Sequence, residues 1–282
     1  SSQKDRIQQL SRFRLSQEEF KKLNKLAEDE KVLFLSTPFD IESVHFLDRL
    51  VPAFKISSGD NNFFPLIDAI AQTGKPIILS TGLADLEEIT VTRDFINGKW
   101  RENSISQDMA MLHCVTNYPV QVKEANLLAI KTLQEKLGVT VGYSDHTLGI
   151  EAAVLSVALG ARIIEKHFTI SKTHSEFRDH QLSADPRDMA ELVKRVKEAQ
   201  LLLGDGEKRP QKSEQASMNA VHRSIMAARD LSRGSIIHWE DLIWLRPGEG
   251  LAPGNEEILV GKKLVRSIQA GEYIRPDDVS GV

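Results

Sequence analysis

Two histidines follow consecutive predicted strands and could bind one metal ion. His146 lies in the sequence YSDHT at 143–147, and His167 lies in EKHFT at 165–169. The carboxyl ends of neighbouring parallel strands share one edge of a sheet, so the two imidazoles can converge there. Two imidazoles completed by oxygen ligands suit Mn²⁺, Zn²⁺ or Fe²⁺. A single histidine at a strand end is more often structural, and only the pairing favours a metal site.

Lysine and hydroxyl side chains end other predicted strands and could hold a small anion. They are Lys55, Ser57, Ser58, Ser80, Thr81 and Lys166. Ammonium and hydroxyl groups donate hydrogen bonds to phosphate and carboxylate oxygens, which indicates a substrate with two or three negative charges. A single serine or threonine is more often a helix cap or turn residue. A lysine inside an apolar strand is costly unless it is paired, so the two lysines are the stronger candidates.

Two further polar segments could contribute to the same site. Asp179 and His180, followed by Ser183, lie in a polar loop after the last of these strands, with a spacing that could reach over the site; a solvated loop is the alternative. Arg246 lies on a predicted tight turn near the C-terminus. Its sequence context alone favours a role as surface decoration.

Six short apolar runs alternate with helical patterns and must position these side chains. The runs are predicted as strands at 32–37, 53–58, 76–81, 109–115, 139–144 and 161–167, and the helices at 16–29, 64–73, 86–96, 126–137, 149–159 and 188–203. This alternation predicts a parallel α/β fold, and polar strand ends are typical of a (β/α)₈ TIM barrel. A closed barrel needs eight strands, so the first two β/α units, about 60 residues, are expected to be absent from this sequence.

The chain is predicted to contain two domains. Residues 1–206 form the incomplete barrel, residues 207–217 form a charged linker that contains Pro210, and residues 218–282 form a small β-rich domain. Within the small domain, DLSRGSII at 230–237 is similar to SIQAGEYI at 267–274, and acidic pairs follow both segments. The similarity predicts a duplicated unit.

Composition excludes several classes of partner. The formal net charge of -4, without any block of like charges, argues against nucleic-acid binding and against a polybasic membrane segment. No apolar stretch approaches the ~18 residues of a membrane span, and residues 1–14 are too polar for a signal peptide. The single cysteine, Cys114, cannot form an internal disulfide, which predicts a cytoplasmic protein.

Six motifs in a fixed order resemble the N-acetylneuraminate (sialic acid) synthase family, including its legionaminate and pseudaminate synthase branches. They are STPFD at 36–40, KISSGD at 55–60, STG at 80–82, HCVTNYP at 113–119, YSDHT at 143–147 and EKHFT at 165–169. The C-terminal part resembles the antifreeze-like (SAF) domain of that family through HRS at 222–224 and RPGEGLAP at 246–253. The resemblance covers nearly the whole chain.

The resemblance implies a synthase that condenses phosphoenolpyruvate with an N-acylated hexosamine, N-acetylmannosamine or a 2,4-diacetamido-trideoxyhexose, to a nonulosonic acid and phosphate. It implies that His146 and His167 bind a divalent metal, Mn²⁺ in the first place and Mg²⁺ or Co²⁺ as alternatives. Both histidines and Lys55 are then catalytic. The residues implied to hold phosphoenolpyruvate are Lys55, Ser58, Ser80, Thr116 and Ser144, and those implied to meet the sugar are Tyr118, Asp179 and Arg246.

Arg246 would reach the sugar because members of the family are domain-swapped homodimers, in which the antifreeze-like domain of one subunit covers the barrel of the other. This implication replaces the interpretation of Arg246 as surface decoration. Two features of the family are absent from the sequence: a glutamate near an Asn-His-Gly pattern, and a Lys-Phe-Gln segment that contacts phosphate and sugar. A protein that began at Ser1 would be expected to have an open, weakly stable barrel without catalysis.

Two other functions compete with the synthase. An aldolase or lyase of the same barrel could use Lys55 to form a Schiff base. A non-catalytic, glycan-binding remnant is the second alternative. The presence of His146, His167, Lys55 and Lys166 favours an enzyme, because such groups are costly to bury without a function.

Overall fold

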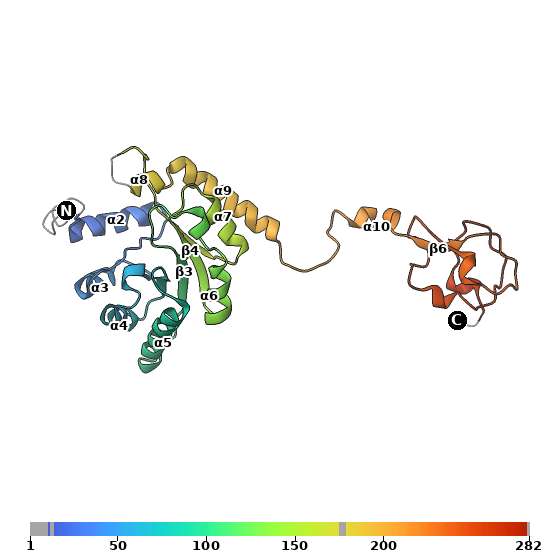
Figure 1. The fold of residues 1–282 in the computed structure, drawn as a ribbon, viewed down its shortest axis with the longest axis horizontal. Coiled ribbons are helices and arrows are strands. Elements are labelled where there is room, and N and C mark those ends of the chain that lie inside the picture. Colours follow the sequence, from blue (N-terminus) through green and yellow to red (C-terminus); the bar gives the residue numbers. More distant parts are fainter. Residues whose placement is uncertain (1–10, 12–13, 175–178, 281–282) are drawn as a thin grey trace. The chain divides into compact units, whose positions relative to one another are not determined.

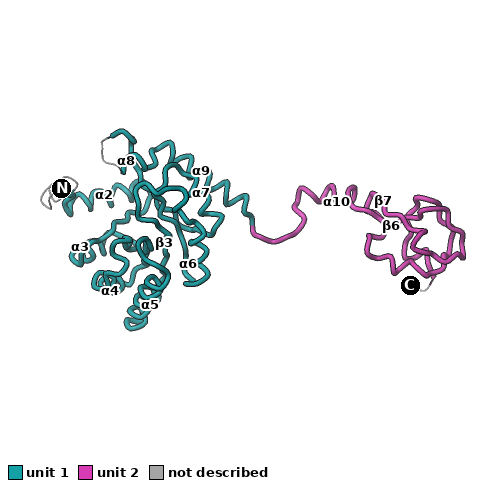
Figure 2. Tube along the Cα trace, in the orientation of Figure 1, with its two compact units in different colours: residues 1–204 teal, residues 205–282 magenta. Residues whose placement is uncertain are grey.

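The computed structural model describes residues 11, 14–174 and 179–280. The chain divides into two compact units, Ser1–Gly204 and Asp205–Val282, which are coloured separately in Figure 2. Each unit is described by itself. None of the helices in the described residues combines the length and the apolar character needed to cross a membrane.

A five-stranded parallel sheet forms the centre of the first unit (Figure 1). The strands pair in chain order, and they are β1 (Phe54–Ile56), β2 (Ile77–Ser80), β3 (Met109–Cys114), β4 (Thr140–Asp145) and β5 (Ile163–Lys166). Parallel neighbours require crossover connections, and helices supply them here. The central strand β3 is buried at every residue, as expected for a strand covered on both faces.

Helices surround this sheet. They are α2 (Gln17–Asp29), α3 (Ile41–Leu47), α4 (Phe64–Gln72), α5 (Leu86–Glu102), α6 (Ala129–Leu137), α7 (Glu151–Ala158), α8 (Asp179–Leu182) and α9 (Pro186–Leu203). Local sequence fixes several starts: Ser16 with Glu19, and Asp85 with Glu88, form reciprocal capping boxes. The Asp185 carboxylate accepts from two backbone N–H groups at the start of α9. The hydrophobic patterns predicted α2, α4, α5, α6, α7 and α9, whereas the short α3 and α8 were not predicted.

The core of the first unit lies between the sheet and its helices. Aliphatic side chains from alternate strand positions pack against helix residues; examples are Ile56, Leu79, Met111, Val141, Leu66, Ile70, Ile96 and Ile130. Each is fully or almost fully buried. Burial of one such side chain contributes about 1.5–3 kcal/mol, so this layer is what holds the strand ends in place.

The sheet is curled into a half-barrel, as a contact between its two outer strands shows. The Nζ atom of Lys55 on β1 lies 3.4 Å from Oε2 of Glu165 on β5. Four strand spacings separate these strands, which in a flat sheet is about 19 Å, further than a lysine and a glutamate can reach together. The curl therefore brings the two ends of the sheet toward each other over a concave face.

The strand predicted at residues 32–37 is wrong. This segment has no ladder partner among the described residues, and β1 pairs there only with β2. Val32 and Leu33 are 60% and 79% exposed. An apolar run becomes a strand only where a neighbouring backbone accepts its hydrogen bonds, and the described part of the chain offers none.

The second unit is built from two similar halves. Its regular elements are α10 (Gln215–Val221), the antiparallel pair β6 (Ser224–Ala227) and β7 (Leu242–Leu245), and short 3₁₀ turns that include Trp239–Asp241 and Pro276–Asp278. Helix α10 begins within the segment predicted as linker.

The predicted duplication in this unit is confirmed by matching contacts. Leu231 and Ile268, 37 positions apart, pair with each other through both backbone hydrogen bonds. The ion pair between Arg229 and Asp241 is repeated between Arg266 and Asp278, again with an offset of 37. The two halves are therefore related by a pseudo-twofold axis and share one apolar core.

Candidate functional site

Polar side chains from four strands or strand ends meet on the concave face of the half-barrel. The Lys55 ammonium donates to Oγ of Ser80 at 2.7 Å and pairs with Glu165. Glu165 also accepts a hydrogen bond of 2.7 Å from Oγ of Ser144. The Lys55 side chain is 11% exposed, and the Glu165 side chain is 42% exposed. The site thus offers a largely enclosed cation beside a carboxylate that solvent reaches.

Two hydroxyl groups pack closely around Gly82, two positions after Ser80. The Gly82 backbone N–H donates to Oγ of Ser58 at 3.1 Å. A Cβ atom on Gly82 would lie 2.3 Å from Oγ1 of Thr116 and 2.8 Å from Oγ of Ser58, so only glycine fits there. Oγ1 of Thr116 is buried and has no hydrogen-bond partner among the described residues. A buried hydroxyl without a partner costs about 1–3 kcal/mol, which indicates a bound group that would satisfy it.

Asn61 holds the Gly82 turn in place and was not predicted from the sequence. The side-chain amide of Asn61 donates to the carbonyl oxygen of Gly82 at 2.9 Å, and the backbone carbonyl of Asn61 accepts from Oγ1 of Thr92 at 2.8 Å. Asn61 is 5% exposed. Asn61 directly follows the KISSGD motif. Neither its residue type nor its spacing indicates that its side chain contacts the Ser80–Gly82 turn, 21 residues further along the chain.

The two predicted metal ligands lie side by side. The ring centroids of His146 and His167 are 5.2 Å apart, and the Tyr118 ring lies 4.3 Å from the first and 5.6 Å from the second. Nδ1 of His146 is 3.0 Å from the Val115 carbonyl oxygen. That contact places the proton on Nδ1 and leaves Nε2 with its lone pair free to bind a metal.

The surroundings of the histidines shift their titration. Burial lowers the pKa of His167, and the neighbouring His146 lowers it further, against the carboxylates of Asp179 and Glu165. Burial also opposes charge on His146, but contacts with the Cys114 thiol and the Val115 carbonyl outweigh it and raise the pKa of His146. His167 is therefore held in the neutral form that a metal ligand requires, and His146 is a comparatively basic imidazole.

The described residues fit part of a metal site. Nowhere in residues 14–174 and 179–280 do three or more His, Cys, Asp or Glu side chains form a metal-holding group. Two imidazoles with one orienting carbonyl match a site that takes its remaining ligands from oxygen groups of other origin. The fit thus rests on the geometry of His146, His167 and Val115.

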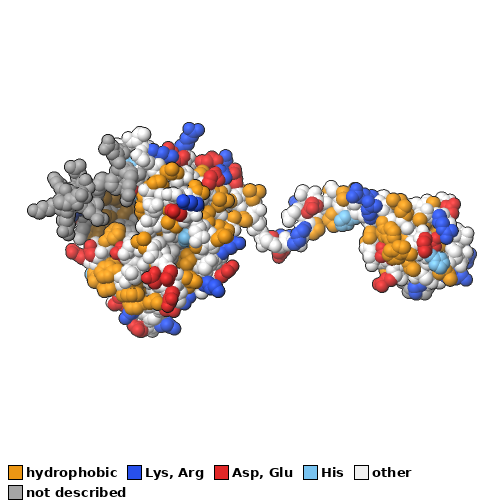
Figure 3. Space-filling view, in the orientation of Figure 1, with side chains coloured by type: hydrophobic (Ala, Val, Ile, Leu, Met, Phe, Trp, Pro, Cys, Tyr) orange, Lys and Arg blue, Asp and Glu red, His pale blue; other side chains and the backbone are white. Residues whose placement is uncertain are grey.

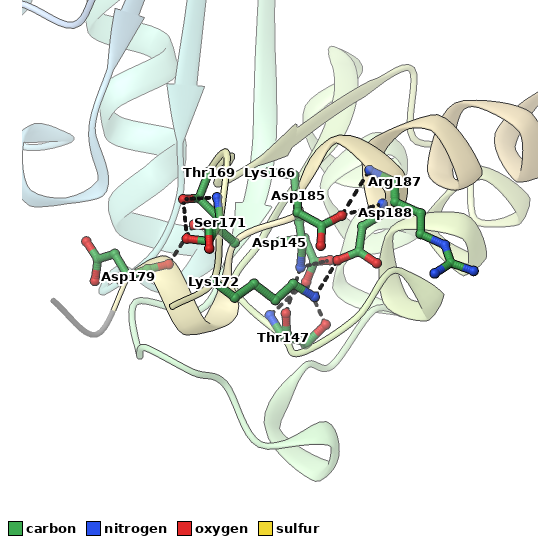
Figure 4. A network of polar contacts seen from close by, with 11 residues as sticks. Asp145, Thr147, Lys166, Thr169, Ser171, Lys172, Asp179, Asp185, Arg187 and Asp188 are labelled. Carbon is green, nitrogen blue, oxygen red and sulfur yellow. Dashed lines mark hydrogen bonds and ion pairs between the residues drawn. The ribbon is translucent and has the colours of Figure 1, made fainter. Parts of the chain in front are cut away.

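Three of the strand-end residues considered for anion binding have other roles. Oγ of Ser57 donates to Asp60 at 2.5 Å and stabilises the turn after β1, and Oγ1 of Thr81 donates to the Leu112 carbonyl of β3 at 3.0 Å and ties the end of β2 to β3. The Lys166 ammonium pairs with Asp145 at 2.8 Å, with side chains that are 2% and 0% exposed (Figure 4). Lys166 therefore does not join Lys55 on the concave face.

The loop that carries Asp179 is fixed at its end by hydrogen bonds. Oγ1 of Thr169 lies 2.8 Å from Nδ1 of His180, and the Asp179 carbonyl accepts hydrogen bonds from the backbone and hydroxyl of Ser183. The Asp179 side chain extends away from the ion pairs shown in Figure 4. Its negative charge acts on His167, which places the carboxylate near the histidine pair. Residues 175–178 of this loop lie outside the described residues.

Arg246 belongs to the second unit. It is exposed and directly follows β7, at the start of the RPGEG segment. Its predicted contact with a sugar stays a prediction.

Comparison with known proteins agrees with the motifs. The NeuB family profile matches residues 1–208, and the SAF domain profile matches residues 222–280. The chain is 41% identical over 263 residues to the N,N'-diacetyllegionaminic acid synthase of Legionella pneumophila, covering 93% of this chain and 73% of that protein. It is 30% identical over 263 residues to the N-acetylneuraminate-9-phosphate synthase of Homo sapiens, covering 92% and 71%.

A solved structure shows the same likeness in three dimensions. The N-acetylneuraminic acid (sialic acid) synthetase of Leptospira borgpetersenii, crystallised with citrate, superposes with a TM-score of 0.71 at 35% identity, covering 77% of this chain and 74% of that one. The chain therefore belongs to the NeuB family and carries a C-terminal SAF domain.

Proposed function

We propose that this protein is a nonulosonic acid synthase, which condenses phosphoenolpyruvate with an N-acylated hexosamine and releases phosphate. The observation that carries the proposal is the proximity of two groups of residues. One group is Lys55 with the hydroxyl groups of Ser58 and Thr116, and the other is the histidine pair. Glu165 connects them, because it pairs with Lys55 and its charge also acts on the pKa of both histidines. The names of the relatives support the same class of reaction.

The first task of the site is to hold phosphoenolpyruvate. Lys55 supplies positive charge, and the hydroxyl groups of Ser58, Ser80, Thr116 and Ser144 surround the same region of the concave face. Phosphate and carboxylate oxygens would satisfy the Thr116 hydroxyl and draw the Lys55 ammonium away from Glu165. Fixing the substrate in this way converts a reaction between two free molecules into one between oriented partners.

The reaction forms two bonds, C3 to the aldehyde carbon and C2 to a water oxygen, and breaks the C2–O bond to phosphate. C3 of phosphoenolpyruvate attacks the aldehyde of the open-chain sugar, and water then adds at C2. One water proton passes to the aldehyde oxygen and the other to the departing phosphate. The products are a 2-keto nonulosonic acid and inorganic phosphate. His146 and His167 would hold a divalent metal, Mn²⁺ in the first place, which when bound supplies Lewis-acid polarisation of the aldehyde oxygen. Tyr118, whose ring lies beside both histidines, and Asp179 would contact the sugar.

The complete enzyme is proposed to be a closed (β/α)₈ barrel that works in the cytoplasm as a domain-swapped homodimer. The curl of the sheet supports the barrel. The free, buried Cys114 fits a reducing compartment. Exposed apolar side chains on the second unit, Ile236, Trp239 and Val265 among them, support a packing role for that unit (Figure 3). Arg246 would then meet the sugar bound in the partner's barrel.

The proposal is tested by phosphate release from phosphoenolpyruvate with N-acetylmannosamine or a 2,4-diacetamido-trideoxyhexose, in Mn²⁺ and in EDTA. We expect release that needs the sugar and stops in EDTA. Mass spectrometry of the product identifies the nonulosonic acid, and light scattering on the same sample gives the mass of the assembly. Phosphate release without a sugar, or none with any N-acylated hexosamine, would contradict the proposal.

Replacing Thr116 with valine separates binding from stability. Valine keeps the shape of the side chain but removes the buried hydroxyl that lacks a partner. We expect the free energy of unfolding to rise by up to about 1 kcal/mol, while KM for phosphoenolpyruvate rises about tenfold. Denaturant unfolding and steady-state kinetics measure the two effects. A loss of stability with unchanged KM would show that the hydroxyl serves the fold instead.

A further inference from the structure

The residues next to the two histidines form a buried network on the opposite face of the sheet. Asp145 precedes His146, and Lys166 precedes His167. The Lys166 ammonium donates to Oδ2 of Asp145 at 2.8 Å and to the Thr147 carbonyl at 2.6 Å. Oδ1 of Asp145 accepts from the backbone N–H and the hydroxyl of Thr147, both at 2.8 Å. This network encloses the backbone on both sides of His146.

The strand register shows on which face of the sheet this network lies. Ser144 is paired with Glu165, and Asp145 is paired with Lys166 across β4 and β5. Successive side chains of a strand point to opposite faces, so the first pair lies on the concave face and the second on the helix-covered face. In agreement, Lys166 lines a cavity together with Met189 and Leu192 of α9. The next positions along the two strands are those of His146 and His167.

A slip of one residue between β4 and β5 would turn one histidine away from the concave face. The Asp145–Lys166 pair forms only in the observed register, one position before the histidines. A buried ion pair adds little stability compared with apolar residues of the same volume, and fixing one register is the better attested role of such pairs.

We propose that the Asp145–Lys166 ion pair positions His146 and His167 relative to each other, and so sets the affinity of the histidine pair for a divalent metal. Both side chains lie on the face opposite the concave one, and both act through the neighbouring imidazoles. The inference rests on the proposed function for the presence of the metal. The Asp145–Lys166 pair itself takes no part in the proposed reaction.

The test compares three variants of the full-length protein. Lys166→Met alone would leave the Asp145 carboxylate buried without a cation, and this variant is the one most liable to misfold. The double variant Asp145→Asn, Lys166→Met removes both charges and keeps a side-chain oxygen for the Thr147 bonds. Lys172→Met is the matched control, because it breaks a second ion pair, with Asp188, that flanks neither histidine (Figure 4).

We expect the double variant to fold, as judged by circular dichroism, and to bind Mn²⁺ about 10–100-fold more weakly in calorimetry. The absorption spectrum of bound Co²⁺ should change, whereas affinity for phosphoenolpyruvate in EDTA should not. Lys172→Met should match the wild type in all three measurements. A folded double variant with wild-type Mn²⁺ affinity, or one that loses metal and phosphoenolpyruvate affinity equally, would overturn the proposal.

The metal measurements need neither a sugar nor turnover, so the two proposals can fail separately. If the wild type binds Mn²⁺ but makes no nonulosonic acid, the proposed function fails and the positioning role is still tested. If His146→Ala and the double variant both bind Mn²⁺ as the wild type does, the ion lies elsewhere and the positioning role is wrong.

Discussion

Replacing His146 with alanine should lower kcat/KM by about 10³-fold, equivalent to about 4 kcal/mol of transition-state stabilisation. His146 presents a free Nε2 beside His167, because the Val115 carbonyl holds its other nitrogen. With one imidazole left, the pair can no longer bind a divalent ion tightly, and the aldehyde loses its polarisation. Steady-state kinetics over a range of Mn²⁺ concentrations measures the effect, with calorimetry for Mn²⁺ binding.

The exposed His45 provides the matched control, since His45→Ala removes an imidazole that lies on helix α3 and not at a strand end. It should leave kcat/KM unchanged. Because His146 is buried, its variant must also be shown to fold, for example by circular dichroism. A folded His146→Ala protein with full Mn²⁺-dependent turnover would refute the assignment of the metal to this pair.

Replacing Lys55 with methionine should raise KM for phosphoenolpyruvate and lower kcat/KM by about 10²–10³-fold. A charge-assisted hydrogen bond to the substrate is lost, at about 1.5–3 kcal/mol. The Glu165 carboxylate, without its ammonium partner, then repels the anionic substrate in addition. The double variant Lys55→Met, Glu165→Gln removes that repulsion and should recover part of the loss. Lys131→Met, on the exposed face of α6, is the control.

Lys55 also distinguishes the proposed synthase from the aldolase alternative. A Schiff-base lysine must present a neutral amine to a carbonyl, whereas the Lys55 ammonium lies between Glu165 and Ser80. We therefore expect no covalent adduct after borohydride treatment with pyruvate. An adduct on Lys55, found by mass spectrometry, would restore the aldolase alternative.

Much of the first unit could be predicted from sequence because periodicity and strand chemistry agree there. The five paired strands coincide with predicted apolar runs, because most of their side chains are buried; only β5 has no fully buried residue. The run at 32–37 has the same composition and yet forms no strand. Hydrogen-bond partners decide that outcome, and a single segment carries no information about its neighbours.

The residues of the candidate site were likewise predicted only in part. His146, His167 and Lys55 were predicted because strand ends share an edge, a rule that needs only the order of elements. Lys166 was wrongly assigned to the anion site. Side chains alternate along β5, so Lys166 lies on the other face of the sheet from Glu165, and the sequence alone did not show which of the two faces inward. Asn61 was missed because its role depends on a contact that only the folded loop creates.

The reciprocal pairing in the second unit has a consequence for how this unit folds. Gly234 donates to the Leu264 carbonyl, and Gly271, at the equivalent position, donates to the Ala227 carbonyl. Each half thus depends on the other for part of its backbone hydrogen bonds, as two subunits of an intertwined dimer would. Neither half can gain much by forming first, so the entropy of closing the chain between them is lost before most contacts form. The unit should therefore fold and unfold in a single cooperative step.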